Sequence, residues 1–310
     1  MLPASRTLDR LHADLALAAR ITGASLSAGD VARVLDTFRD GLLGTSVQLR
    51  TTSKPLGQRQ LCFRYLDLVS GEHPLDLAYA SGELSERDDP THRWLLDVRQ
   101  RFGALGYGVD FEADRGLAKI WQFLDRAWRP VDLGARLAMP PGFAPSLGLL
   151  EELGLDAVTI VGTDYLRDSI NLYFRPPAHD VLARACERLG FPAPSRLAVR
   201  HAAQAGCIAF TYGWRSAVVE RICFYVSGFS RGAVPAYDPI FLEFAAKAPA
   251  LVDDPRFIVS WSHGRGGHYF KLEDDYTGDV SEIFTAAMTV PPALSSAALT
   301  SHSPPHQLAG

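Results

Sequence analysis

GGHYFKLEDDYTG, residues 266–278, shows the alternation of a β-strand that separates two kinds of side chain. Tyr269, Lys271 and Glu273 alternate with large apolar residues. Because successive side chains of a strand point to opposite faces, one face carries a hydroxyl, an ammonium and a carboxylate, and the other is apolar. A single strand of this kind is most simply amphipathic, with its polar side in water. Whether other strands repeat the pattern decides if the polar face meets water or the protein interior.

The same alternation recurs in four further segments. Their polar faces hold Cys62 with Arg64, Lys119 with Trp121 and Phe123, Asn171 with Tyr173 and Arg175, and Arg221 with Cys223 and Tyr225. These faces mix aromatic rings with single cations, whereas a solvent face is usually built from Glu, Lys and Ser. The opposite faces are apolar and need a packing partner, which helices between the strands can supply. We therefore expect the polar faces to line the interior of a barrel.

Ten strand-like segments form five pairs, and helical periodicity precedes each pair. The pairs are 46–53 with 60–68, 107–113 with 115–124, 157–164 with 169–175, 207–214 with 217–226, and 257–264 with 268–276. The helical segments are 7–21, 29–43, 75–84, 90–104, 145–153, 178–190, 238–247 and 279–288. Short turns within each pair indicate antiparallel hairpins, and ten antiparallel strands lose their exposed edges when they close into a barrel.

The expected fold class is therefore α+β. It is a ten-stranded antiparallel β-barrel with a solvent-filled or ligand-filled lumen, surrounded by a ring of helices in repeated ααββ units. A sheet covered by helices on one face is the alternative architecture. No linker divides the chain, so we expect one domain over residues 1–290, followed by a disordered tail over 291–310 that is rich in Pro, Ser and Ala.

Composition argues against several classes of function. The formal net charge of −4 provides no basic field for nucleic acid or acidic lipid. The apolar runs are too short to cross a bilayer, and the first residues lack the apolar block of a signal peptide. The four cysteines show no CxxC spacing, so reduced thiols in the cytoplasm are the simplest account. We expect a cytoplasmic monomer that binds neither nucleic acid nor membrane.

The expected lumen collects several cations. Lys119, Arg221 and Lys271, joined by Arg50 and Arg64, would all point inward. Two like charges about 4 Å apart repel by roughly 4 kcal/mol at an effective dielectric constant near 20. Such a cluster is understandable if a polyanion fills the lumen, and a diphosphate suits several converging Arg and Lys donors.

Six motifs in order, between residues 34 and 284, carry a family resemblance. They are VLDTFRD, RTTSKP, DRGLAKIW, INLYFR, ERICFYV and SHGRGGHYFKLEDDYTG. The chain resembles the soluble aromatic prenyltransferases of the ABBA type, whose fold is a ten-stranded barrel inside a ring of helices. It is most similar to the branch that contains the clorobiocin-pathway 4-hydroxyphenylpyruvate dimethylallyltransferase and the phenazine prenyltransferases.

The resemblance implies a set of site residues. Those implied to bind the donor diphosphate are Arg50, Lys54, Arg64, Lys119, Asn171, Tyr173, Tyr212, Arg221, Arg265 and Lys271. Those implied to contact the aromatic substrate are Glu273, Thr159, Tyr269, Cys223 and Trp121, and those implied to be catalytic are Glu273, Lys119, Tyr173 and Tyr212. Arg265 also has a simpler interpretation, because the GRGG turn is a glycine-permitted hairpin.

Two positions depart from relatives in the family. Thr159 stands where the enzyme for 4-hydroxyphenylpyruvate has an arginine for the substrate carboxylate, which leaves a phenazine-type acceptor as the alternative. Cys62 stands where the magnesium-dependent branch has an aspartate, and a thiol is a poor magnesium ligand. The chain also has no DDxxD motif. We therefore expect neither a metal nor a cofactor.

The resemblance implies transfer of a dimethylallyl group from dimethylallyl diphosphate to an aromatic small molecule, phenazine-type or phenolic, by electrophilic aromatic substitution in secondary metabolism, as in antibiotic biosynthesis. The same chemistry with geranyl diphosphate is one alternative. A non-catalytic small-molecule-binding barrel is another, but its lumen would be mostly apolar. The chain has no Walker or HExxH motif that would favour another reaction.

Overall fold

The computed structural model describes residues 7–68, 73–85, 88–175 and 181–292. Its strands are β1 (Ser46–Thr52), β2 (Leu61–Asp67), β3 (Ala104–Glu112), β4 (Gly116–Trp128), β5 (Val158–Asp164), β6 (Ser169–Phe174), β7 (Cys207–Gly213), β8 (Val219–Phe229), β9 (Phe257–Gly264) and β10 (Gly267–Asp275). Each strand pairs antiparallel with its neighbours in the chain, and β1 pairs with β10 to close the barrel. The predicted barrel is confirmed, and the one-sided sheet is excluded.

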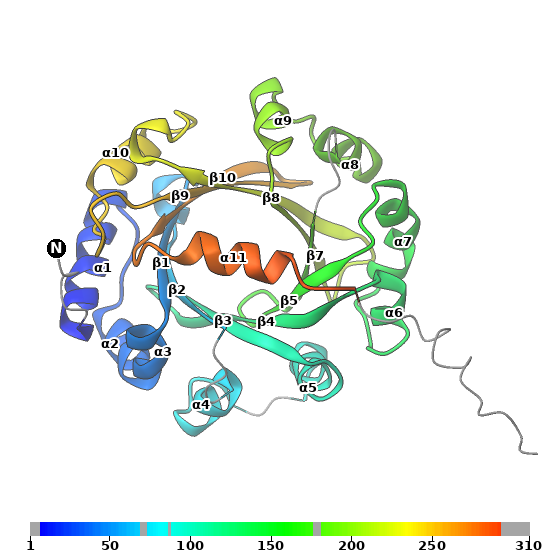
Figure 1. Cartoon of the computed structure of the whole chain (residues 1–310), viewed down its shortest axis with the longest axis horizontal. Helices are drawn as coiled ribbons and strands as arrows, with labels where there is room; N and C mark the ends of the chain where they lie inside the picture. Colours follow the sequence, from blue (N-terminus) through cyan, green and yellow to red (C-terminus); the bar gives the residue numbers. More distant parts are fainter. Residues whose placement is uncertain (1–6, 69–72, 86–87, 176–180, 293–310) are drawn as a thin grey trace, which may run out of the picture.

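Helices surround the barrel (Figure 1). They are α1 (Leu8–Thr22), α2 (Ala28–Thr37), α3 (Arg39–Gly44), α4 (Pro74–Ala80), α5 (Pro90–Arg101), α6 (Pro130–Gly134), α7 (Phe143–Glu152), α8 (Val181–Leu189), α9 (Arg196–Ala202), α10 (Pro239–Lys247) and α11 (Val280–Met288), with 3₁₀ turns η1 (Leu56–Gln58) and η2 (Arg231–Ala233). None of these helices has both the length and the apolar composition needed to cross a bilayer. Most of the predicted tail, residues 293–310, lies outside the described part of the chain, so its disorder stays a prediction.

The helices differ from the sequence-based expectation in three places. The helix expected over 29–43 divides at Phe38 into α2 and α3, and the break lets Gly41 lie against the ring of Tyr65. The short helices α6 and α9 were not predicted, because five and seven residues are too few to show helical periodicity. Their starts carry only local signals, a proline at the start of α6 and the N-cap Ser195 of α9.

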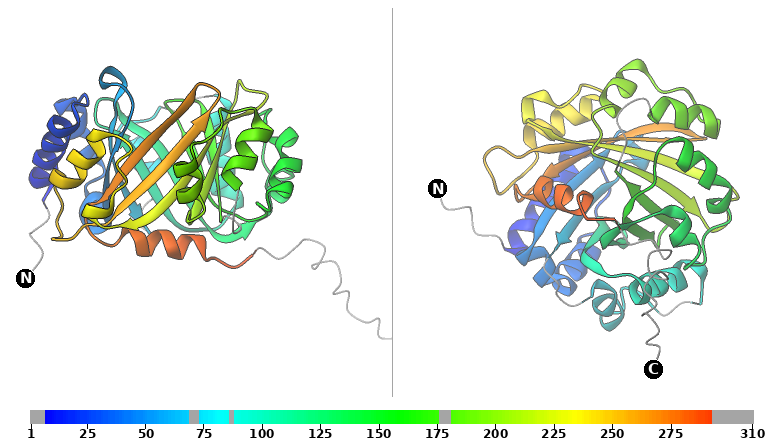
Figure 2. Two further views of the ribbon diagram at one scale, coloured as in Figure 1. Left: turned by 90° about the horizontal axis from the view of Figure 1, so that it is seen from above. Right: turned by 45° about the vertical axis from the view of Figure 1, so that its right-hand side comes forward.

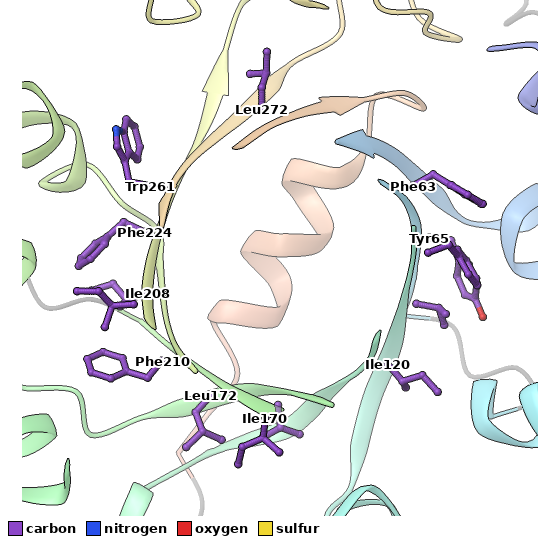
Figure 3. Close-up of a cluster of buried hydrophobic side chains, with 14 of the residues drawn as sticks. Phe63, Tyr65, Ile120, Ile170, Leu172, Ile208, Phe210, Phe224, Trp261 and Leu272 are labelled. Atoms are coloured by element: carbon purple, nitrogen blue, oxygen red, sulfur yellow. The ribbon is translucent and has the colours of Figure 1, made fainter. Parts of the chain in front are cut away.

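The apolar strand faces point outward and pack under the helices, as predicted. Figure 3 shows side chains such as Phe63, Leu172, Phe224 and Leu272 projecting away from the barrel axis. These four are fully buried or nearly so. Burying each side chain of this size contributes about 1.5–3 kcal/mol to stability, which fixes the register of every strand. The alternate residues, including Lys271 and Glu273, are therefore directed into the lumen.

α11 closes one end of the barrel. It lies across that end in Figure 1 and beneath the strands in the left view of Figure 2. Asp275 accepts hydrogen bonds from the backbone N–H of Gly278 at 2.7 Å and of Val280 at 3.1 Å, which holds the N-terminus of the helix. Nε of Arg175 donates to the carbonyl of Met288 at 2.8 Å, which holds the C-terminus. α11 therefore closes the lumen at this end, and the hairpin turns of β5–β6, β7–β8 and β9–β10 lie at the other end.

A buried carboxyl group outside the lumen makes stability depend on pH. Asp274 is fully buried, and neither of its carboxyl oxygens has a hydrogen-bond partner among the described residues. Burial raises its pKa well above the ordinary value, despite the opposing effect of Arg231. Because the folded protein favours the neutral acid, this group's contribution to stability is complete below its unfolded pKa of about 4 and is lost as the pH rises above it.

We expect Asp274→Asn to stabilise the protein increasingly as the pH rises. The gain in unfolding free energy over wild type should grow by about 1.4 kcal/mol per pH unit above about 4, until the folded pKa is reached. Urea unfolding at about pH 5 and pH 7 measures it, with the exposed Asp253→Asn as the matched control. An equal gain at both pH values would show that Asp274 is ionised in the folded protein.

Candidate active site

Three cations meet around Tyr269 in the half of the lumen away from α11. Arg221, on β8, donates from Nη1 to the Tyr269 hydroxyl at 3.3 Å. Lys54, in the turn after β1, places Nζ 4.7 Å from the centre of the Tyr269 ring, and Nζ of Lys271 lies 5.9 Å from it. We call Lys54, Arg221, Lys271 and Tyr269 the anion site.

No carboxylate forms a salt bridge with the three cations of the anion site among the residues that the structure describes. Their contacts are with neutral groups. Lys54 donates to the side-chain carbonyl of Gln60 at 3.1 Å, and Lys271 approaches the sulfur of Cys223 at 3.5 Å. Arg221 also donates to Thr211, whose hydroxyl donates in turn to Asn171 at 2.8 Å. The positive charge here is therefore available to a bound anion.

The Tyr269 hydroxyl responds to this charge. Burial alone would raise its pKa, but the positive charges of Arg221, Lys271 and Lys54 outweigh burial and lower the pKa to about 7. Such a shift requires a strongly positive environment, because phenol hydroxyls ordinarily titrate near pH 10.

The anion site opens to the surface through a mouth at the end opposite α11. This cavity has a volume of about 480 Å³. Its charged lining consists of Arg167, Arg221, Arg265, Glu220 and His268, and Tyr269 also lines it. A ligand as large as a diphosphate ester can therefore reach the anion site from solvent.

The other interior cations are paired with carboxylates. Nη2 of Arg50 lies 2.8 Å from Asp110, and Arg64 contacts both Glu273, at 2.9 Å, and Asp110, at 3.3 Å. Lys119 lies 3.4 Å from Asp164; burial outweighs this partner and lowers the pKa of Lys119 to about 8. Carboxylates therefore relieve the expected repulsion at Arg50 and Arg64, whereas Lys119 is still repelled by Arg221 and Lys271.

An aromatic chamber lies between the paired cations and α11. It is lined by Arg64, Leu66, Trp121, Phe123, Ile160, Tyr173, Tyr225 and Phe284. The indole N–H of Trp121 donates to the hydroxyl of Tyr173 at 2.9 Å, and the Arg64 guanidinium lies 4.7 Å from the centre of the Trp121 ring. Only about 10 Å³ is free, about enough for one water molecule.

Glu273 has one oxygen available for a ligand. Its Oε2 accepts the hydrogen bond from Arg64, whereas Oε1 is buried and has no hydrogen-bond partner among the described residues. Two residues along β10, on the same face, stands Lys271 of the anion site. Glu273 is therefore placed beside the anion site, on the side toward α11.

Comparison with known proteins agrees with this geometry. The family model for aromatic prenyltransferase Orf2 matches residues 7–288, which is nearly the whole chain. The chain belongs to the aromatic prenyltransferase Orf2 family. The resemblance inferred from the six motifs is confirmed.

Two curated relatives of this aromatic prenyltransferase come from Streptomyces. The 5,10-dihydrophenazine-1-carboxylate 9-dimethylallyltransferase of Streptomyces anulatus is 28% identical over 281 residues, covering 87% of this chain and 93% of that protein. The 4-hydroxyphenylpyruvate 3-dimethylallyltransferase of Streptomyces niveus is 27% identical over 307 residues, covering 92% and 90%. Among solved structures, the 5-dimethylallyl tryptophan synthase of Streptomyces coelicolor in complex with DMASPP and Trp superposes with a TM-score of 0.57 at 13% identity, covering 94% of this chain and 99% of that one. This last likeness shows the shared fold.

One residue implied to be in the prenyltransferase site faces the other way. Tyr212 shares the outer face of β7 with Ile208 and Phe210; its hydroxyl is 2.9 Å from that of Ser146 in α7, and its ring packs on Phe143. The expectation that Tyr212 lines the lumen is therefore wrong. Ile208 and Phe210 lie on the outer face of β7. Counting from them along the strand places Tyr212 on the outer face and Thr211 on the inner face.

Two further predicted residues lie at the ends of the lumen. Thr159 is fully buried, and its hydroxyl contacts the sulfur of Met288 at 3.2 Å, so it faces the end of α11. Arg265 is exposed in the β9–β10 turn and lines the mouth. The remaining predicted residues lie in the anion site, the paired network around it or the aromatic chamber, except Asn171 and Cys223, which lie beside the anion site. Their roles stay predictions.

The structure also brings in residues that sequence reasoning did not select. Asp110 and Asp164 stand on the inner faces of β3 and β5, where alternation from Val109 and Thr163 could have placed them. Tyr225 was recognised as inward-facing but not as part of the site. Phe284 could not have been placed from the sequence, because its contact with the chamber depends on how α11 folds back across the barrel.

Cys62 does not have the character of a metal ligand. It is fully buried beside Arg50, and burial raises the pKa of its thiol to about 11. Magnesium prefers hard oxygen ligands, so this buried thiol is a poor ligand for it. Among the described residues, no group of three or more His, Cys, Asp and Glu side chains is placed to hold a metal ion.

Proposed function

We propose that this protein transfers a dimethylallyl group from dimethylallyl diphosphate to a ring carbon of an aromatic small molecule. The observation that carries the proposal is the anion site, where three cations that have no carboxylate partner in the described part of the chain adjoin a chamber of aromatic rings. A non-catalytic carrier of apolar ligands would gain nothing from unneutralised buried charge, which is costly to retain.

The anion site is suited to the first chemical step. Lys54, Arg221 and Lys271 would bind the donor diphosphate and stabilise the charge that grows on it as the allylic C–O bond breaks. The resulting dimethylallyl cation would lie against the faces of Tyr173, Trp121 and Tyr225, which attract a cation through their ring quadrupoles. The enclosure of the chamber would keep out the water that would otherwise capture the cation.

Glu273 is suited to the second step. Its free Oε1 would accept a hydrogen bond from a ring hydroxyl or amine of the acceptor, which raises the electron density of the ring. The ring carbon attacks the cation, the new C–C bond forms, and the proton on that carbon must then be removed. Glu273 could accept a proton through the acceptor's hydroxyl or amine, the general-base role that buried carboxylates often fill.

The names of the relatives support the shorter donor. Both Streptomyces relatives are named dimethylallyltransferases, which favours dimethylallyl diphosphate over geranyl diphosphate. The free space of about 10 Å³ in the chamber is smaller than one isoprene unit, so either donor requires the chamber to widen. For the acceptor, the names of the two Streptomyces relatives support a phenazine-type or phenolic compound of secondary metabolism.

A cytoplasmic, monomeric enzyme is the simplest setting for this activity. The four cysteines are buried and form no disulfide, which is consistent with a reducing compartment. Gel filtration coupled to light scattering tests the monomer, and a mass of twice the chain would contradict it.

The experiment for the function is a product assay. Purified protein with dimethylallyl diphosphate is offered a panel of dihydrophenazine carboxylates, 4-hydroxyphenylpyruvate and dihydroxynaphthalenes, and both pyrophosphate and prenylated product are measured. We expect pyrophosphate release that depends on the aromatic compound and matches product formation. Tight binding of an aromatic compound with no release of pyrophosphate would favour the carrier instead.

We predict full activity in excess EDTA. The fixed cations of the anion site would replace the magnesium that usually neutralises a diphosphate, and Cys62 and Arg64 occupy a strand that offers no carboxylate toward it. Product formation is compared with and without EDTA after the protein has been stripped of metal. Loss of activity that magnesium restores would show that Lys54, Arg221 and Lys271 do not suffice.

A further inference from the structure

We propose that the Tyr269 hydroxyl is the counter-anion of the empty anion site, and that binding of the donor diphosphate is therefore coupled to uptake of a proton by this hydroxyl. The proposal rests on the proposed function for the identity of the ligand. A role for Tyr269 as a substrate contact alone would not require its hydroxyl to take up a proton when the donor binds.

The geometry places Tyr269 at the centre of the unpaired charge. Its hydroxyl accepts a hydrogen bond from Arg221 at 3.3 Å, and Lys54 lies over its ring. The facing charged and titratable groups are Arg221 and Cys223 on β8, Lys271 on β10 itself and Lys54 after β1. The charged groups of the mouth are Arg167, Arg265, His268 and Glu220, and Glu220 is the one carboxylate among the described residues that line it. The groups in direct contact are therefore cationic or neutral, and Tyr269 is the side chain among them positioned to supply a negative charge.

Neighbouring groups show why this role falls to Tyr269. Arg50, Arg64 and Lys119 have Asp110, Glu273 and Asp164 as partners, so their charge is already compensated. The other lumen tyrosines, Tyr173 and Tyr225, lie in the aromatic chamber, where burial raises the pKa of both. Tyr269 differs from them because the cations around it have no carboxylate partner within the described ranges, and these cations lower its pKa to about 7.

A phenolate and a diphosphate cannot both occupy the anion site, because two negatively charged groups in direct contact repel each other strongly. When the diphosphate enters, the phenolate takes one proton from solvent and becomes a neutral phenol. The neutral hydroxyl can then donate a hydrogen bond to a diphosphate oxygen. Above the pKa of Tyr269, donor affinity should therefore fall by up to tenfold per pH unit, the limit for one linked proton.

The test uses the near-ultraviolet absorbance band of tyrosinate. The wild-type protein is titrated from about pH 5.5 to pH 9, with Tyr269→Phe and, as matched control, Tyr107→Phe on the outer face of β3. We expect one tyrosinate to appear with an apparent pKa near 7 in wild type and in the control, and not in Tyr269→Phe. Lysine and cysteine protonation near the site does not contribute to a tyrosinate difference band, so the readout is specific.

The coupling is tested at about pH 8 by adding the S-thiolodiphosphate analogue of the donor, which does not ionise readily. We expect the tyrosinate band to disappear on binding, and we expect binding by Tyr269→Phe to depend less on pH than binding by wild type. If the analogue binds but the band persists, or if no tyrosinate forms below pH 9, the proposal is wrong while the proposed function stands. If the analogue does not bind at all, both fail.

Discussion

Arg221→Ala should lower kcat/KM for dimethylallyl diphosphate by roughly ten- to a hundredfold with the fold intact. Arg221 has no carboxylate partner among the described residues, so its removal leaves no buried carboxylate without a partner. The loss is that of one charge-assisted contact to the diphosphate, about 1.5–3 kcal/mol. Lys271→Ala should give a loss of the same size, because it approaches the same site from β10.

The matched control is Arg215→Ala. Arg215 stands in the turn before β8, its side chain is 91% exposed, and it carries the same charge. Thermal unfolding of all three variants separates a loss of fold from a loss of function. Wild-type turnover in Arg221→Ala or Lys271→Ala would remove the anion site from the mechanism.

Glu273→Gln should reduce turnover by about a hundredfold, within the range for loss of a positioned proton acceptor, while binding of the donor analogue changes little. The amide keeps the shape of the side chain and one oxygen for Arg64, and Asp110 still compensates Arg64. What is lost is the negative charge beside the acceptor. The diphosphate gains nothing from a carboxylate, so its affinity has no reason to fall.

Rate at saturation and affinity for the donor analogue are measured separately for this variant. Glu273→Asp provides the matched control, because it keeps the charge but withdraws it from the chamber; partial activity is expected. A Glu273→Gln variant that loses donor affinity but keeps its rate at saturating donor would place Glu273 in the anion site instead.

The alternation of side chains made most of the fold predictable. Residues 266–278 and four other segments separate polar from apolar faces so clearly that closure into a barrel, with the apolar face under helices, follows from burial alone. The same alternation gave the inward placement of Lys119, Arg221 and Lys271. Where the assignment followed the resemblance instead, as for Tyr212, the strand periodicity was the better guide, because Ile208 and Phe210 fix the outer face of β7.

The balance of charge in the lumen could not be predicted in the same way. Which cation is neutralised depends on the register between strands: Asp110 stands opposite Arg64 on one side and Lys119 on the other, and Asp164 stands opposite Lys119. The sequence of a single strand does not indicate which residue of the neighbouring strand lies opposite a given side chain. The contribution of Phe284 depends on a long-range fold-back of α11, held by Asp275 and Arg175, which sequence periodicity cannot show.

We expect the donor diphosphate to bind among Lys54, Arg221 and Lys271 around Tyr269, beside the aromatic chamber. A crystal structure with the S-thiolodiphosphate analogue of dimethylallyl diphosphate tests this most directly. We expect diphosphate oxygens within hydrogen-bond distance of Lys54, Arg221 and Lys271, with the prenyl chain directed toward Trp121 and Tyr173. A diphosphate bound outside the lumen, or held by Arg50 and Arg64 after displacing Asp110 and Glu273, would contradict it.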